Sequence, residues 1–133
     1  MNPTNRRHFL QTAAGAAALS GQILAPWVKA RSKSGKKYRT ALIGSGWWGM
    51  NILRVALADG SVDVVALCDV DADELEVSAD EVEGLTGKMP ATYRDYRELL
   101  AKEQIEIAIV STPDHWHALQ GIACIEAGAH VFV

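Results

Sequence analysis

The sequence predicts an α/β fold in which a parallel, doubly wound sheet carries helices on both faces. Short apolar segments with strand character alternate with segments whose apolar residues recur every three or four positions. Most of the joining segments contain glycine, aspartate or proline. Repeated strand–helix units form parallel sheets with right-handed crossovers, and a length of 133 residues suits one such domain.

The first two strand–helix units follow from the spacing of apolar residues. Strands are expected at residues 39–43 and 62–68, where apolar and β-branched side chains are concentrated. Between them, Ile52, Val55 and Ala56 have the spacing of one helix face and predict a helix that ends near residue 58. A second helix, closed by Gly84 and Gly87, is expected to bury three apolar residues: Leu75, Ala79 and Val82.

A third helix is expected between a short extended piece at residues 91–92 and a strand at 105–110. Asp95 can cap it, with Glu98 as the reciprocal partner of a capping box. Its apolar side would consist of Tyr96, Leu99 and Leu100. The following strand is almost wholly apolar, which suits a parallel strand covered on both faces.

A fourth helix is expected after that strand, with Thr112 as its cap and Pro113 at its first position. Gly128 would end it, and a further strand would begin at residues 129–133. The residues expected to face the sheet are Ala118, Ile122 and Ile125.

Charge is distributed unevenly along the chain. The net charge is -3, yet no acidic residue precedes Asp59, and nine of the 13 basic residues do. The body of the chain is therefore acidic, and it has no ladder of aromatic residues on which bases could stack. We expect no nucleic-acid partner.

Residues 1–30 have the order of a bacterial export signal: a basic start, a mildly apolar run at 12–25, and small residues at a cleavage site at 28–30. Adjacent Arg6 and Arg7 followed by a Phe-Leu pair are typical of the twin-arginine type, although Asn5 and Gln11 replace residues common there. An uncleaved anchor and a cytosolic tail are the alternatives. The apolar run is shorter than the roughly 20 residues that cross a bilayer, so no stable membrane span is expected.

The domain plan is therefore a signal peptide at residues 1–30, a basic linker at 31–37 and a folded domain at 38–133. A protein with this signal would be exported, to the periplasm in a bacterium with two membranes. The twin-arginine route carries folded proteins, often with a cofactor already bound.

A glycine-rich turn, GSGWWG at residues 44–49, follows the first strand and opens the first helix. In a dinucleotide-binding Rossmann fold, Gly44 would allow the tight turn, Gly46 the approach of the pyrophosphate, and Gly49 close packing of helix on strand. The pyrophosphate would lie at the helix N-terminus, where unpaired N–H groups favour negative charge. Ser45 belongs to the same predicted site.

Asp69 lies twenty residues after Gly49, at the end of the second strand. A carboxylate there accepts hydrogen bonds from the adenosine ribose and repels the additional phosphate of NADP. The predicted cofactor is therefore NAD, with NADP less favoured. The alternative is a glycine turn with a purely structural use and a solvated Asp69.

Two further groups of residues belong to the predicted cofactor site. Trp47 and Trp48 could wall the cofactor or pack in a core or domain interface. Thr112, Pro113 and His117 lie in the segment TPDHWH, at the carboxyl end of a strand, where open α/β sheets bind ligands. These residues could contact the nicotinamide half of the cofactor or simply pack at the start of the helix.

No metal site is predicted. His115 and His117 are two residues apart, so a helix points them in different directions, and no third ligand is evident. A general base at one of these histidines is chemically conceivable, but no catalytic residue is assigned. Cys68 and Cys124 have no metal or redox spacing, and both are expected to be buried thiols.

Residues 37–133 resemble the N-terminal domain of the Gfo/Idh/MocA-like oxidoreductases, the glucose–fructose oxidoreductase and inositol 2-dehydrogenase family. The resemblance rests on five segments in order: ALIGSG with Gly49, ALCDVD at 66–71, YRDYRELL at 93–100, VSTPDHWH at 110–117 and EAGAHV at 126–131. It implies oxidation or reduction of sugars or polyols by hydride transfer with NAD(P), in a homo-oligomeric full-length protein.

The resemblance also implies parts that this sequence does not include. Family members continue from the strand at residue 130 into a Glu-Lys-Pro motif with a catalytic lysine, and then into a substrate-binding C-terminal α+β domain. We therefore expect the N-terminal part of an exported oxidoreductase, an incomplete Rossmann domain that is inactive alone. The alternatives are a non-catalytic dinucleotide-binding module and a decayed gene product.

Overall fold

The computed structural model describes residues 35–133, so the predicted signal at residues 1–30 lies outside the described residues. The described part alternates strand and helix throughout, in the order β1 Tyr38–Ile43, α2 Trp47–Asp59, β2 Val62–Cys68, α3 Ala72–Thr86, β3 Ala91–Tyr93, α4 Tyr96–Lys102, β4 Ile107–Val110, α5 Asp114–Glu126 and β5 His130–Phe132. No helix in residues 35–133 is both long enough and apolar enough to cross a membrane.

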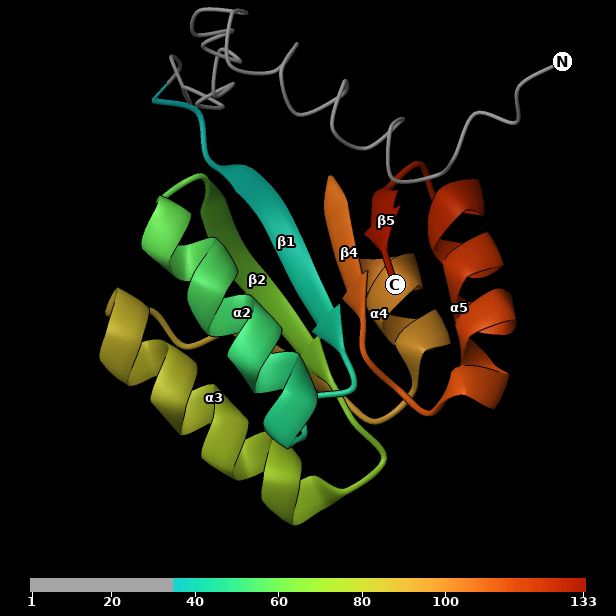
Figure 1. The fold of residues 1–133 in the computed structure, drawn as a ribbon, viewed down its shortest axis with the longest axis horizontal. Helices are drawn as coiled ribbons and strands as arrows, with labels where there is room; N and C mark the ends of the chain where they lie inside the picture. Colours follow the sequence, from blue (N-terminus) through green and yellow to red (C-terminus); the bar gives the residue numbers. More distant parts are fainter. Residues whose placement is uncertain (1–34) are drawn as a thin grey trace, which may run out of the picture. The chain divides into compact units, whose positions relative to one another are not determined.

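The five strands form one parallel sheet in the order β3-β2-β1-β4-β5. The order reverses at β1, because the chain moves outward through β2 and β3 and then returns to add β4 and β5 on the other side of β1. Figure 1 shows α2 and α3 side by side over β1 and β2. The predicted α/β fold with a doubly wound parallel sheet is confirmed.

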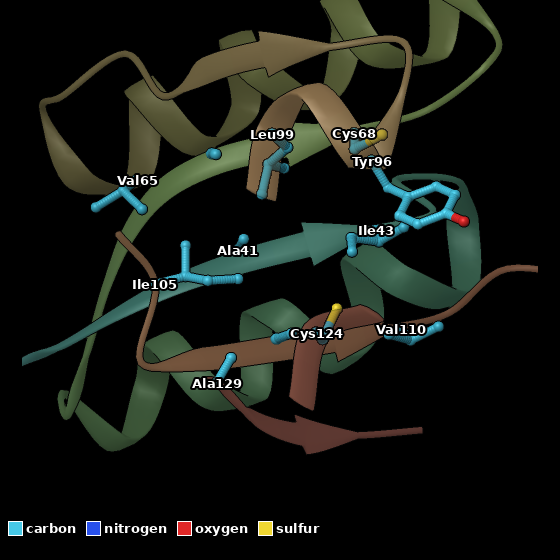
Figure 2. Packing of buried hydrophobic residues seen from close by; sticks show 12 residues of the cluster. Ala41, Ile43, Val65, Cys68, Tyr96, Leu99, Ile105, Val110, Cys124 and Ala129 are labelled. Atoms are coloured by element: carbon cyan, nitrogen blue, oxygen red, sulfur yellow. The ribbon is translucent and has the colours of Figure 1, made fainter. Parts of the chain in front are cut away.

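Two apolar clusters lie on the two faces of the sheet. Alternate residues of β1 point to opposite faces, so Leu42 packs with α2 and α3, whereas Ala41 and Ile43 pack with α4 and α5. Figure 2 shows the second cluster, in which Leu99 and Cys124 approach the sheet from the two helices on that face. Both cysteines are buried free thiols, as predicted.

The predicted face is right for α3, right in part for α2, where Ile52 and Ala56 pack against the core, and wrong for α5. Leu75, Ala79 and Val82 are buried as expected, but Val55 of α2 is exposed and Met50 and Leu53 take its place. In α5, the expected stripe of Ala118, Ile122 and Ile125 faces outward. Gln120, Gly121 and Cys124 face the sheet instead. Periodicity identifies a stripe but not its direction, and the buried stripe of α5 is the more polar one.

The predicted helix starts also need two corrections. Asp95 caps α4 by accepting from the Arg97 backbone N–H, but the Glu98 carboxylate lies 3.8 Å from Lys102 Nζ and is not the reciprocal partner. Pro113, with ψ at 144°, precedes the helix as its N-cap residue, so α5 begins one residue later than expected. The Thr112 hydroxyl is not a cap because it is hydrogen-bonded to a side chain of α5.

Candidate functional site

A pocket of about 540 Å³ lies at the carboxyl ends of β1, β2 and β4, where the strand order reverses. Open α/β sheets bind ligands at this position, because loops from neighbouring strands diverge there to opposite faces of the sheet. The residues that line the pocket come from the turns after the strands and from the helices that follow: Ile43, Gly44, Gly46, Cys68, Asp69, Val70, Arg94, Asp95, Tyr96, Arg97, Ser111, Thr112, Pro113, Trp116 and Gln120.

The glycine turn fits tightly between the ends of β2 and β4. Gly44 has φ of 91°, a conformation that favours glycine, and its N–H donates to the Cys68 carbonyl at 2.8 Å. A Cβ on Gly44 would lie 2.7 Å from the Ser111 carbonyl carbon and 2.8 Å from the Thr112 nitrogen. Backbone atoms of the turn that follows β4 therefore occupy the space that any larger residue needs.

The other two glycines of the turn have contrasting surroundings. A Cβ on Gly49 would lie 2.0 Å from the Gly44 carbonyl oxygen, so the first turn of α2 packs directly on the glycine turn. A Cβ on Gly46 would meet no atom within 4 Å, and Gly46 lines the pocket. The space beside Gly46 is thus open to a ligand that approaches the backbone closely.

The N-terminus of α2 is suited to an anion. The first helical hydrogen bond runs from the Met50 N–H to the Gly46 carbonyl at 3.0 Å, which leaves the preceding N–H groups without acceptors in the helix. No acidic residue lies in the first turn. The helix dipole and these N–H groups therefore favour negative charge at this end of the pocket.

Asp69 links the glycine turn to the start of α3. Its Oδ2 accepts from the Ser45 backbone N–H at 2.7 Å, and its Oδ1 accepts from the Asp71 N–H at 3.1 Å. A carboxylate offers about four lone-pair sites, so both oxygens keep capacity for further donors. Asp69 is half-buried at the edge of the pocket. At this position the carboxylate can accept hydrogen bonds from two ligand hydroxyl groups.

The turn between β4 and α5 is held by side chains. The Thr112 hydroxyl donates to Gln120 Oε1 at 2.5 Å, and His117 Nε2 lies 2.6 Å from the Thr112 carbonyl oxygen. Because a carbonyl can only accept, His117 Nε2 carries the proton. Thr112 and Pro113 line the pocket, whereas His117 supports the turn from behind and is not among the lining residues.

The two tryptophans lie on the surface of the described domain. Trp47 and Trp48 are 75% and 59% exposed, so neither packs in the core of the described domain, and neither lines the pocket. Their rings are 5.6 Å apart. Trp48 instead borders a second, apolar groove with Ile52, Ile107 and Phe132.

Cys68 is the one thiol that lines the pocket among residues 35–133. Burial raises the pKa of this thiol to about 12, and the carboxylates of Asp69 and Asp95 add to the shift. The thiol is therefore protonated at neutral pH and is a poor nucleophile or metal ligand. Within the described domain, no group of three or more histidine, cysteine or acidic side chains is arranged to hold a metal ion.

Sequence reasoning missed the lining residues that follow β3. Arg94 Nη2 donates to the Val70 carbonyl at 2.8 Å, and the Arg97 guanidinium lies 4.9 Å from the centre of the Tyr96 ring. All three residues lie at the carboxyl end of a strand, which is the signal that could have identified them. Gln120 carries no such signal, because it lies in the middle of a helix.

These features fit a dinucleotide. The open space beside Gly46 adjoins the N-terminus of α2, where a pyrophosphate can bind. The Asp69 carboxylate lies where a ribose can bind. Ser111 adds a polar atom at the floor, since its buried Oγ has no hydrogen-bond partner in the domain. Of the predicted site residues, the pocket brings together Gly44, Gly46, Asp69, Thr112 and Pro113. Ser45, Gly49 and His117 support its walls.

Comparison with known proteins agrees with this geometry. Residues 38–133 match the GFO_IDH_MocA family, described as an oxidoreductase family with an NAD-binding Rossmann fold. A glycosyl hydrolase family 109 protein of Stenotrophomonas maltophilia is 36% identical over 132 residues, which cover 95% of this chain and 28% of that protein. The chain thus spans about a third or less of such relatives.

Solved structures give the same result. The myo-inositol 2-dehydrogenase of Lactobacillus plantarum aligns with a TM-score of 0.65 and 28% identity, over 73% of this chain and 27% of that one. The WlbA dehydrogenase of Bordetella pertussis, solved with NADH and UDP-GlcNAcA, aligns with a TM-score of 0.60 and 26% identity, over 72% and 27%. Fold, pocket and relatives agree, and this chain belongs to the Gfo/Idh/MocA oxidoreductase family with its NAD-binding Rossmann fold.

Proposed function

We propose that this chain is the NAD-binding part of an exported sugar or polyol oxidoreductase. The observation that carries the proposal is the pairing of an open space at Gly46 with the anchored Asp69 carboxylate, in one pocket at the reversal of the strand order. Membership of the family supports hydride transfer as the chemistry.

Each part of the pocket has a role in holding the cofactor. The glycine turn and the N-terminus of α2 would bind the pyrophosphate through backbone N–H groups. Asp69 would accept hydrogen bonds from the adenosine ribose, and the turn at Thr112 and Pro113 would contact the nicotinamide half. When bound, a nicotinamide ring takes up or returns a hydride at a hydroxyl-bearing carbon.

NAD is proposed over NADP because of the charge of Asp69. A phosphate on the ribose hydroxyl would lie beside this carboxylate, and two negative charges at contact distance repel each other. Arg94 is nearby, but its guanidinium donates to the Val70 carbonyl, which holds it to the neighbouring turn.

The cofactor function is tested by thermal unfolding with and without NAD. A hundredfold excess of NAD over its Kd stabilises the folded state by about 2.7 kcal/mol, which is roughly 10 °C or more for a domain of this size. Asp69→Ala should remove most of this shift. Asp71→Ala is the matched control, because it also removes a carboxylate that accepts backbone hydrogen bonds but lies outside the pocket lining.

The Asp71→Ala control distinguishes loss of a cofactor contact from a general loss of stability. Asp71→Ala should lower the melting temperature without NAD and keep the full shift with NAD. A wild-type chain that NAD does not stabilise would contradict the cofactor function. An Asp69→Ala variant with an unchanged shift would contradict the role of this carboxylate.

The proposed substrate is a polyhydroxylated ring, since the relatives include proteins named for inositol oxidation and for glycoside hydrolysis. Glycoside hydrolysis is the second candidate, favoured by the 36% identity to a family 109 protein. Oxidation would leave NADH, whereas hydrolysis would release the aglycone without net NADH. We expect the catalytic step to need residues beyond this sequence. Turnover of polyols or aryl glycosides by this chain alone would contradict that expectation.

Export through the twin-arginine route is proposed from the sequence of residues 1–30. Replacing Arg6 and Arg7 by lysine keeps the charge and should leave the protein in the cytoplasm, while the wild type reaches the periplasm. Cell fractionation measures both. Equal distribution of the two proteins would contradict this route.

A further inference from the structure

A buried hydroxyl group holds the glycine turn from the side of α3. Ser78 is 3% exposed, and its Oγ donates to the Ser45 carbonyl oxygen at 2.7 Å. Ser45 itself is completely buried, and its N–H donates to Asp69. Ser45 is thus fixed at both its N–H and its carbonyl group, by two side chains from different elements.

The carbonyl group that Ser78 holds belongs to the same peptide unit as the Gly46 N–H. The described domain has no cis peptide bond, and in a trans peptide the carbonyl and N–H groups point in opposite directions. A carbonyl directed at Ser78 therefore directs the Gly46 N–H away from α3. Gly46 lines the pocket and has open space beside it.

We propose that Ser78 is a positioning residue for cofactor binding, because it turns the Gly46 N–H toward the site of the cofactor pyrophosphate. Ser78 does not line the pocket, so it acts only through this peptide unit. The inference rests on the proposed NAD-binding function and adds a residue that the glycine turn alone does not reveal.

Alanine at residue 78 would remove the donor and free the peptide unit to rotate. A hydrogen bond to a charged acceptor is stronger than one between neutral groups. Misaligning the bond from the Gly46 N–H to the pyrophosphate should therefore raise the Kd for NAD by about tenfold. Adenosine has no phosphate and should bind about equally well to both forms. Cysteine at the same position keeps the volume with a weaker donor, and an intermediate Kd is expected.

Thr86→Ala is the matched control. Thr86 lies on the same helix, and its Oγ1 also donates to a backbone carbonyl group, that of Val82 at 2.8 Å, but within the helix itself. It lies in the last turn of α3 and outside the pocket lining. A general loosening of α3 should therefore affect this variant as well, whereas the proposed role should not.

The experiment titrates NAD and adenosine into the full chain and its Ser78→Ala, Ser78→Cys and Thr86→Ala variants, with the Gly46 amide resonance followed by NMR. The proposal predicts that NAD shifts this resonance in the wild type and less so in the Ser78 variants. It predicts weaker binding of NAD, but not of adenosine, in those variants only. If Ser78→Ala does not fold, the isosteric Ser78→Cys decides.

Two results would overturn the proposal and leave the cofactor function standing. One is a wild type that binds NAD together with Ser78 variants that bind it equally well. The other is an equal loss of affinity for NAD and adenosine, which would mean that Ser78 only stabilises the fold. A wild type that binds no NAD would contradict the cofactor function itself.

Discussion

Replacing Gly49 with alanine would place a methyl group against the backbone of the glycine turn. The new Cβ would lie 2.0 Å from the Gly44 carbonyl oxygen and 3.2 Å from Ser111 Cβ. Ordinary contacts begin near 3.5 Å, so the backbones must separate by more than roughly 1 Å. Neither close neighbour is the end of a flexible side chain, and the strain has no simple relief.

The size of the effect follows from two opposing contributions. Alanine is favoured over glycine in a helix by about 1 kcal/mol, and overpacking costs typically 1–3 kcal/mol and sometimes more. The clash at Gly49 lies at the upper end of the overpacking range. Gly49→Ala should therefore destabilise the fold by at least about 2 kcal/mol, or roughly 10 °C in melting temperature.

Gly46→Ala should weaken cofactor binding and leave the stability of the fold almost unchanged. Its φ of -65° suits any residue, and its Cβ would meet nothing within 4 Å, so the free energy of unfolding should change by less than about 1 kcal/mol. The methyl group would occupy the open space beside the turn, and the Kd for NAD should rise by at least about tenfold. Gly84→Ala, at an open position within α3, is the control that should leave NAD binding unchanged.

Urea unfolding and calorimetric titration measure the two properties separately. A Gly49→Ala variant as stable as the wild type would refute the packing of α2 on the turn. A Gly46→Ala variant with wild-type affinity would refute the approach of the pyrophosphate to Gly46.

Three further predictions concern stability and reactivity. Asp71→Ala should lower the free energy of unfolding by about 1 kcal/mol, because the Asp71 carboxylate accepts from the backbone N–H groups of Asp73 and Glu74 at the start of α3; an unchanged urea midpoint would contradict this cap. The thiols of Cys68 and Cys124 have pKa values raised by burial from 9.0 to about 12 and about 11. Their contribution to stability should therefore be full below about pH 9 and be lost as the pH rises toward 11–12, and urea unfolding at pH 8 and pH 10 should show the decline. Both thiols should also resist iodoacetamide at pH 8 until the chain is unfolded, and alkylation of the native protein at the unfolded rate would contradict their burial.

The parts of the fold that sequence predicts best are those with a local physical signal. The strand at residues 62–68 and the buried stripe of α3 follow from β-branched residues and regular spacing, and both match the structure. Gly44 and Gly49 have the tight surroundings expected of a sharp turn and of close helix packing, and the space beside Gly46 is open. The distance of Asp69 along the chain from the glycine turn identifies it as the candidate ribose carboxylate.

The parts that sequence missed depend on contacts between distant residues. In α5, Gly121 and Cys124 are buried against the sheet, whereas the more apolar Ile122 and Ile125 are exposed, so apolar spacing alone indicates the wrong face. The hydrogen bond from Thr112 to Gln120 removes the expected cap, and only the folded chain brings these side chains together. Ser78 joins the site in the same way, from the far side of the glycine turn.

Calorimetric titration of NAD and NADP into the wild-type chain measures how the pocket distinguishes the two cofactors. Because the pocket combines an anion-binding turn with the Asp69 carboxylate, we predict one NAD per chain and binding of NADP at least about tenfold weaker. Binding of neither dinucleotide would contradict the cofactor function, and binding of NADP as tightly as NAD would contradict the role of the Asp69 carboxylate.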